Sequence, residues 1–474
     1  MPHRLLRSAA IAAALAPAVA VSASAETLLD AMRDAYYFEP TIEATRDELR
    51  ALGQIVPITE AGRLPTLAFV AQQQVNRSIT DPANPLAERT TNPGSFGFNG
   101  QVPLYDGGRT ANEVSEAEAN VDAGYARLND AEQQTLLLTV QVFFDILRDA
   151  EVRDLTRLNL RLLNEELEAS ELRFEVGEVT LTDVAQARAR VAEANANVIQ
   201  AEGALRASAA RYAAVVGRLP TGLEPPDALP QLPPSLADAQ TEALASHPTI
   251  RASRSAERAA IFAIRAAMAG KLPTVDLSAS LTTSLSQGFA GDTLFSTGDD
   301  DQRDVTAGLT LSLNAPIYQG GRVDSQVRRA RLIASQRRSE YHAAVRLVER
   351  DLAVSWQSFV SAVGAIEAGV ERVRAARIAF EGLREELRVG ARSTVDVLDA
   401  EEELLAARIA LVNQTRERNV AAYAILAAMG RLDPERMGLT PVIDSRTNPQ
   451  AVIPPNPYGA PQDAPMAWRF PWRP

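Results

Sequence analysis

The chain has 474 residues, a formal net charge of −12 at pH 7 and 46% hydrophobic residues. The surplus of negative charge argues against nucleic acid as a partner. The chain contains no cysteine, which excludes disulfide bonds and a lipid anchor on an N-terminal cysteine.

The first residues have the three parts of a secretory signal peptide. Arg4 and Arg7 give a positive start, an apolar run follows over 9–21, and Ala23-Ser24-Ala25 is a small-residue cleavage site. We predict a signal peptide over 1–25 and a secreted chain that begins at Glu26. No later segment has about 18 consecutive apolar residues, so we expect no transmembrane helix. If the chain is embedded in a membrane, it must be there as a β-barrel.

The remaining sequence repeats itself once. Leu64-Pro65-Thr66 recurs 208 positions later at 272–274, and Gly217-Arg218-Leu219 recurs 213 positions later at 430–432. Pro103 already recurs at the larger offset, as Pro316. The second copy therefore gains five residues between Thr66 and Pro103, which indicates an exposed loop there. The repetition predicts one structural repeat over 26–233 and a second over 234–434. A proline-rich tail, expected to be irregular, follows over 435–474.

Each repeat opens with a helical pattern, expected over 27–61 and 235–269. Pro40 and Pro248 predict a break in each of these helices.

A pair of strands is expected next in each repeat, with polar loops near 76–94 and 283–303. The clearest strand covers 305–314, where apolar and polar or small residues alternate. Each strand is about the 9–11 residues that a tilted strand needs to cross a bilayer. A half-buried hairpin of a soluble protein would show the same alternation, but the signal peptide and the second copy favour membrane strands.

Long helical hairpins are expected after the strands, because no proline occurs over 104–219 or 317–433. Gly177 and Gly390 each suit the left-handed residue that ends a helix. The patterns that follow, Thr180-x-x-Asp183 and Ser393-x-x-Asp396, match capping boxes at the start of a returning helix. We therefore predict a mainly α protein with a small β part. It has two long antiparallel helical hairpins in a coiled-coil tunnel and four transmembrane strands.

The signal, the duplication, the strand pairs and the hairpins together resemble the TolC family of outer-membrane channel proteins. The most specific stretch is Val389-Gly390-x-Arg392-x-x-Val395-Asp396-Val397-Leu398-Asp399-Ala400, which is similar to the periplasmic entrance of that family. Thr182-Asp183-Val184 looks like the partner tip. The resemblance covers the secreted chain to about Pro434, and the lack of cysteine places it nearer the unlipidated branch.

The resemblance implies a homotrimer in the outer membrane. Four strands per subunit would complete a twelve-stranded barrel in lipid, and the helices would continue it as a tunnel into the periplasm. A periplasmic adaptor protein would dock at the tips, at Gly177 and Gly390, and an inner-membrane transporter of the ABC or RND class would supply the cargo. Unpaired strand edges, which lipid forbids, support closure by an oligomer, but the residues alone do not give the number three.

Two carboxylates follow the second tip. Asp396 and Asp399 are three residues apart and share one helix face. In the implied trimer they would form a ring at the pore entrance that attracts cations, and crowding would raise some of their pKa values. Alternatively, Asp396 is only a helix cap and Asp399 only a solvated surface charge.

A gate network at the tips is implied for Thr182, Asp183 and Arg392, because the matching family residues help to hold the entrance closed. The family uses a tyrosine three residues before the second tip glycine, where this chain has Leu387. We therefore expect a weaker or differently built closure.

No catalytic set, P-loop or Cys/His cluster is present, so we expect neither an enzyme nor a cofactor or bound metal. We predict a passive exit duct for a pump and its adaptor, in type I protein secretion, multidrug efflux or both. One alternative is a secreted coiled-coil spacer or adhesin without a pore, and a weaker one is a soluble periplasmic enzyme.

Overall fold

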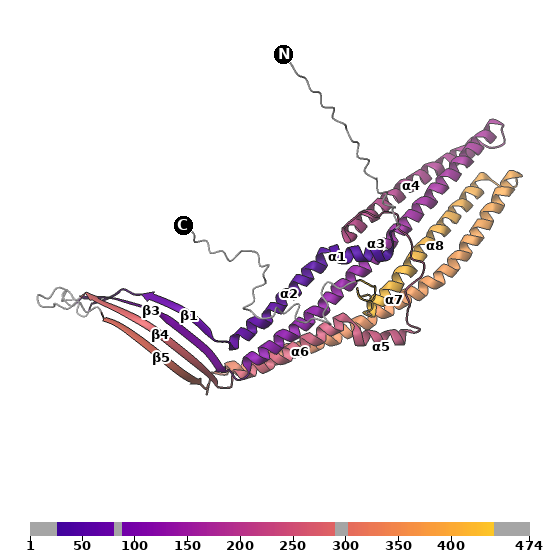
Figure 1. The fold of residues 1–474 in the computed structure, drawn as a ribbon. Coiled ribbons are helices and arrows are strands. Elements are labelled where there is room, and N and C mark those ends of the chain that lie inside the picture. Colours follow the sequence, from indigo (N-terminus) through magenta and orange to yellow (C-terminus); the bar gives the residue numbers. More distant parts are fainter. Residues whose placement is uncertain (1–25, 80–87, 290–301, 440–474) are drawn as a thin grey trace, which may run out of the picture.

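The computed structural model describes residues 26–79, 88–289 and 302–439. The predicted signal peptide and the tail from residue 440 onward lie outside these residues. Within them the chain is mainly helical with one sheet, as predicted. In Figure 1 the sheet lies at one end of an elongated molecule and two helical hairpins extend to the other end.

Each repeat opens with a helix that is broken by a proline. The first repeat has α1 (Leu28–Phe38) and α2 (Pro40–Glu60), and the second has α5 (Leu236–Ser246) and α6 (Pro248–Ala269). The proline is the first residue of the second helix in both repeats. Proline suits that position because its fixed φ is already helical and the missing N–H would have no partner there. The predicted breaks are confirmed.

The sheet is antiparallel, with the strand order β1-β3-β4-β5. Its strands are β1 (Thr66–Gln73), β2 (Asn76–Ile79), β3 (Glu88–Tyr105), β4 (Thr274–Phe289) and β5 (Gln302–Asn314). Because β2 pairs with β3 just as β1 does, the sheet is four strands wide, as predicted. The expected strand length was too short, since β3 has 18 residues and β4 has 16. These strands extend into segments that were expected to be loops.

The predicted alternation sets the two faces of the sheet. Phe69 pairs with Phe98, Phe98 pairs with Leu281, and Leu281 pairs with Ala307, so one face is apolar across all four strands. Large side chains on this face are open, and Leu309, for example, is 73% exposed. Serine, threonine and glycine are frequent on the opposite face, where for example Ser280 pairs with Gly308.

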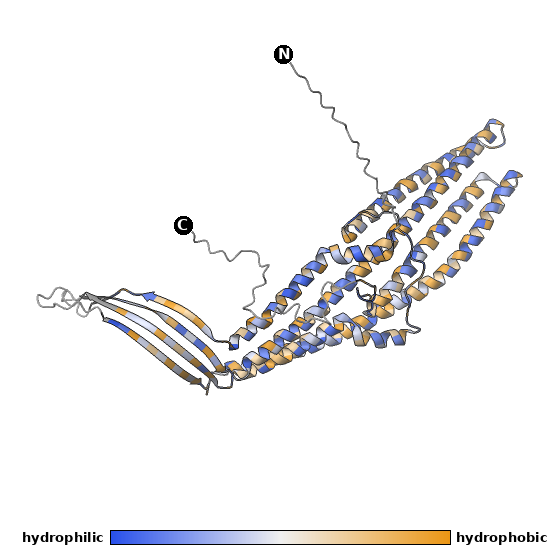
Figure 2. Cartoon of the chain, viewed as in Figure 1, coloured by the Kyte–Doolittle hydropathy of each residue, from blue (hydrophilic) through white to orange (hydrophobic). Residues whose placement is uncertain are grey.

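Two antiparallel hairpins form the rest of the molecule. The first joins α3 (Arg109–Glu175) to α4 (Leu181–Val216), and the second joins α7 (Arg322–Arg388) to α8 (Thr394–Ala428). The long helices have 67 residues each, which at about 1.5 Å per residue span about 100 Å. Figure 2 shows hydrophobic and hydrophilic residues mixed along both hairpins. Among the described residues, none of the helices combines the length and apolar character needed to cross a membrane.

The main hydrophobic core lies where α1 and α2 pack against the hairpins. It includes Tyr36, Phe143 and Tyr212, all fully buried. The start of the C-terminal tail belongs to this core, because Leu439 is buried in it and its N–H donates to the carbonyl of Pro434. Residues 435–439 form turns without helix or strand, and these turns return the apolar side chain of Leu439 to the core.

Candidate functional site at the hairpin tips

The two tips have the same backbone design. Gly177 has φ of 78° and Gly390 has φ of 74°, in the left-handed region that glycine adopts without a steric penalty. A side chain at either position would have open space around it, so the backbone conformation alone requires glycine. In each tip a backbone hydrogen bond closes the turn. The N–H of Glu178 donates to the Arg173 carbonyl, and the N–H of Ala391 donates to the Glu386 carbonyl.

Reciprocal capping starts the returning helices. The N–H of Asp183 donates to the Thr180 hydroxyl, while the N–H of Thr180 donates to the Asp183 carboxylate at 2.9 Å. Ser393 and Asp396 make the same pair of bonds, the second at 3.1 Å. Both capping boxes were predicted, and both are present.

The two carboxylates of the expected ring have different surroundings. Asp396 is the partner of the N-cap residue Ser393 in the capping box, and its hydrogen bonds from Ser393 hold its pKa below the usual range. Crowding was expected to raise such pKa values, whereas within one chain the pKa of Asp396 moves in the opposite direction. Asp399 is exposed, but its carboxylate lies 2.7 Å from the guanidinium of Arg190 on the other hairpin.

The residues of the expected gate network lie at the tips, where Arg392 and Asp183 have local partners. Arg392 forms an ion pair at 2.8 Å with Glu386 of its own tip. Asp183 is held in its capping box, which lowers its pKa, and Thr182 is exposed at the start of α4. That these residues form one network that holds the entrance closed remains a prediction.

Arg190 joins the two hairpins near the tips and was not singled out from the sequence. It lies on α4, and its guanidinium reaches Asp399 and also Glu402, at 2.8 Å, on α8. The partners are more than 200 positions apart in the sequence. Only the alignment of the two hairpins brings them together, so no local pattern could have identified the contact.

Glu401 is a second residue that the sequence analysis missed. Its side chain is buried on α8, and one carboxylate oxygen has no hydrogen-bond partner. Burial raises its pKa to about 7, the nearby Glu165 and Glu166 act in the same direction, and Arg384 opposes them. It borders a cavity of about 300 Å³ between α3, α7 and α8. A signal existed, because Glu401 interrupts the apolar stripe of Val397, Leu398 and Leu404.

The chemistry available at the tips is that of charge and shape. Within the described ranges, no group of three or more histidine, cysteine or acidic side chains is arranged to hold a metal ion. The tips offer exposed turns, a set of carboxylates and a guanidinium that bridges the hairpins. Such an arrangement can bind another protein, control the spacing of helices and influence passing ions.

The chain is similar to known proteins in both sequence and fold. A model of the outer membrane efflux protein family matches residues 31–218 and 240–431. The outer membrane efflux protein BepC of Brucella suis is 34% identical over 418 residues, which cover 88% of this chain and 88% of BepC. The outer membrane protein TolC of Escherichia coli is 28% identical over 340 residues, covering 69% of this chain and 68% of TolC.

The fold is also similar to solved structures. The crystal structure of the outer membrane protein VceC from Vibrio cholerae superposes with a TM-score of 0.70. The match covers 85% of this chain and 96% of VceC, at 22% sequence identity. Because the sequence identity is low, this similarity is evidence about the fold alone.

Proposed function

Because the chain belongs to the outer membrane efflux protein family, we propose that it is the passive exit duct of a pump that spans the cell envelope. It is an outer-membrane channel protein that extends into the periplasm. In the proposed function, three copies assemble into one duct, and the hairpin tips form its gated entrance. Cargo would enter at the tips and leave through the end that carries the sheet.

The observation that carries the proposal is the apolar face of the sheet. Val305, Leu309, Leu311 and Leu313 are each more than 60% exposed on β5, and Leu67 and Phe69 on β1 are equally open. An exposed apolar patch of this kind marks a surface that another apolar phase or a partner covers. Lipid is the covering phase that fits an outer-membrane protein.

The edges of the sheet support assembly. β1 and β5 are the two outer strands, and an unpaired edge in lipid leaves backbone groups without partners at a cost of several kcal/mol each. In the proposed trimer, β5 of one copy pairs with β1 of the next, and twelve strand positions close one barrel. No free edge then remains.

The tips lie at the opposite end of the molecule from the sheet (Figure 1). We propose that the exposed turns at Gly177 and Gly390 receive a periplasmic adaptor protein, which couples the duct to an inner-membrane ABC or RND transporter. Asp396 and Asp399 would face the entrance, and Arg392, Asp183 and Thr182 would link neighbouring chains when the entrance is closed. Exposed polar links stabilise by only about 0–1 kcal/mol each, so a closed entrance could open at modest cost.

Conductance in planar bilayers tests the duct and its gate together. The purified protein from the outer-membrane fraction should form channels, and Arg392→Ser combined with Asp183→Ala should increase their conductance. Arg374→Ser serves as the control and should not increase the conductance, because it removes an exposed arginine of α7 that is paired within its own helix to Glu371. A protein that inserts no channels would favour the spacer or adhesin without a pore.

The cargo class is tested in cells that lack the gene. Loss of resistance to several unrelated drugs, restored by the wild-type chain, is expected for multidrug efflux. Loss of a secreted protein from the medium is expected for type I secretion. If neither changes, the chain is not the exit duct of either kind of pump.

A further inference from the structure

A buried polar site surrounds Glu26, the residue that follows the predicted signal peptide. Glu26 is only 4% exposed. Its N–H donates to the Gly222 carbonyl at 3.1 Å, and its carbonyl accepts from the N–H of Glu224 at 3.0 Å. The backbone of the first secreted residue is therefore paired on both sides with the segment that joins the two repeats.

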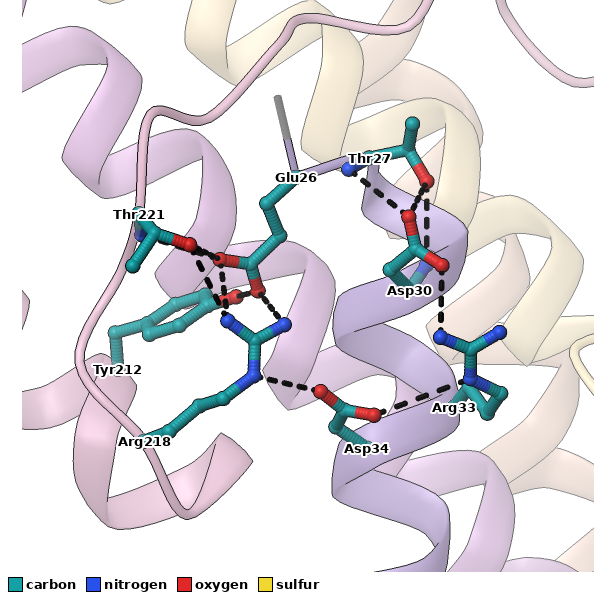
Figure 3. Close-up of polar contacts among 8 residues, drawn as sticks. All are labelled: Glu26, Thr27, Asp30, Arg33, Asp34, Tyr212, Arg218 and Thr221. Atoms are coloured by element: carbon teal, nitrogen blue, oxygen red, sulfur yellow. Dashed lines mark hydrogen bonds and ion pairs between the residues drawn. The ribbon is translucent and has the colours of Figure 1, made fainter. Parts of the chain in front are cut away.

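The carboxylate of Glu26 also has several hydrogen-bond and ion-pair partners (Figure 3). Arg218 contacts both carboxylate oxygens, at 2.8 and 2.9 Å. Thr221 donates its N–H at 3.2 Å, and the hydroxyl of the fully buried Tyr212 also donates to the carboxylate. Burial and the adjacent carboxylate raise the pKa of Tyr212, so the hydroxyl stays protonated as a donor. A buried carboxylate persists only with such partners.

The second repeat shows which part of this site is special to the first. Arg218 also binds Asp34 at 2.7 Å, and its counterpart Arg431 binds Glu242, the counterpart of Asp34, at 3.1 Å. The arginine–acid bridge between the end of one hairpin and the opening helix is thus common to both repeats.

The groups that bind Glu26 beyond this bridge occur in the first repeat alone. At the offsets of the repeat, Glu26 corresponds to Pro234, Tyr212 to Ile425 and Thr221 to Pro434. The carboxylate, the phenol and the N–H donor are all replaced by groups that cannot make these bonds. The acceptor and its donors therefore occur together, at the place where the predicted cleavage would create a new end.

The cleavage chemistry involves the same nitrogen. Hydrolysis after Ala25 adds water across the peptide bond: the hydroxyl joins the Ala25 carbonyl carbon, and the Glu26 nitrogen leaves with a proton as an amine. A free α-amino group ordinarily has a pKa of about 8, so at neutral pH the new end is largely an ammonium, which makes a stronger, charge-assisted bond to a carbonyl. A protease needs an accessible, extended segment, which a docked Glu26 does not offer.

We infer that Tyr212, Arg218 and Thr221 form a docking site for the N-terminal glutamate released by signal-peptide cleavage, and that cleavage precedes docking. The released end then fastens α1 to the end of α4 and to the segment between the repeats. This inference rests on the predicted cleavage after Ala25 and is independent of the proposed duct. It makes the junction of the two repeats dependent on processing.

The test uses the full chain with its leader, assembled in detergent and treated with bacterial signal peptidase, with N-terminal sequencing of the product. We expect the unfolded precursor to be cut after Ala25 at least ten times faster than the assembled one. Arg218→Ala should accelerate cleavage of the assembled precursor several-fold. Arg431→Ala, which breaks the corresponding bridge of the second repeat, should leave cleavage slow.

Several results would overturn the inference. These are equal cleavage rates for assembled and unfolded precursor, equal effects of Arg218→Ala and Arg431→Ala, or a cut at another bond. Pulse-chase labelling in cells covers the case of a precursor that does not assemble in detergent. There, the shortened chain should appear before resistance to trypsin, and a trypsin-resistant precursor preceding it would contradict the proposed order.

Discussion

The helices of the hairpins are held by different forces at their two ends. Beside α1 and α2 they contribute to a core of 27 buried hydrophobic residues, whereas the cluster nearest the tips contains four: Leu163, Ala187, Ala194 and Leu398. Near the tips, ion pairs such as that of Arg190 with Asp399 join the hairpins instead. Apolar burial contributes far more stability than exposed ion pairs do. The part of the hairpins beside α1 and α2, here called the body, is therefore the more stable part. The tips can rearrange at a lower cost in free energy.

The largest expected effect tests the body. Phe143→Ala empties a fully buried position of α3 in the main core and should lower the free energy of unfolding by about 3–5 kcal/mol. Phe174→Ala removes the same side chain near the first tip, where it is 42% exposed, and should cost far less. Denaturant unfolding in detergent measures both. Equal losses would mean that the tip is as tightly packed as the body.

Glu401 is the exception near the tips, since it places a carboxyl group inside the apolar seam between hairpins. Its pKa is raised from the ordinary 4.5 to about 7, so the fold binds the proton more tightly than the unfolded chain does. Stability is then highest below pH 4.5 and falls as the pH rises to about 7. At about 1.4 kcal/mol per pH unit, the loss is at most on the order of 3 kcal/mol.

Glu401→Gln should remove this loss. We expect the variant to unfold at a higher temperature than the wild type at pH 8, with a difference that shrinks toward pH 4.5. Glu402→Gln, on the exposed neighbouring residue, is the matched control and should show no such pH dependence. A difference that is constant across the pH range would mean that the titration of Glu401 does not limit stability.

The difference between the tips and the rest of the molecule also explains which features could be predicted from the sequence. The tips were predictable because glycine at positive φ and the boxes of Thr180 with Asp183 and Ser393 with Asp396 are local features, encoded within a few residues. The faces of the sheet followed from alternation, which survives any change in strand length. The strand ends were not predictable, because β3 and β4 extend each other by pairing over residues with little strand character, such as Gly94 and Ser284.

Contacts between the hairpins lay beyond prediction for a related reason. The pairing of Arg190 with Asp399 depends on how two long helices align, and a shift of one turn would give Asp399 another partner. Leu439 and Glu26 are likewise positioned by contacts with residues far away in the sequence, such as that of Glu26 with Arg218. Local sequence determines the ends of helices, whereas packing determines which charges meet.

A smaller effect on stability is expected at the two tips, which can be compared directly. Thr180→Ala and Ser393→Ala each remove the hydroxyl that accepts the capping bond and should each destabilise the returning helix by about 0.5–2 kcal/mol. The partners Asp183 and Asp396 have lowered pKa values. Their contribution is therefore present above their ordinary pKa and is lost as the pH falls through the lowered values. Hydrogen exchange of the first turns of α4 and α8 measures both, and unequal losses would show that the tips are held differently.

The smallest effect on stability, and the most informative one for function, concerns Arg190 and Asp399. Both side chains are partly exposed, so Arg190→Ala should change the free energy of unfolding by only about 0–1 kcal/mol. It should nevertheless release the charges of Asp399 and Glu402 and strengthen the block of channel current by multivalent cations added on the tip side. Asp399→Ala should do the reverse, because it removes a carboxylate from the proposed entrance ring. Arg188→Ala, which frees Glu171 of the first hairpin, is the matched control for loss of one arginine. If Arg190→Ala and Asp399→Ala change the block in the same direction in an assembled channel, Asp399 is not an entrance charge that Arg190 neutralises, and their contact serves only to align the hairpins.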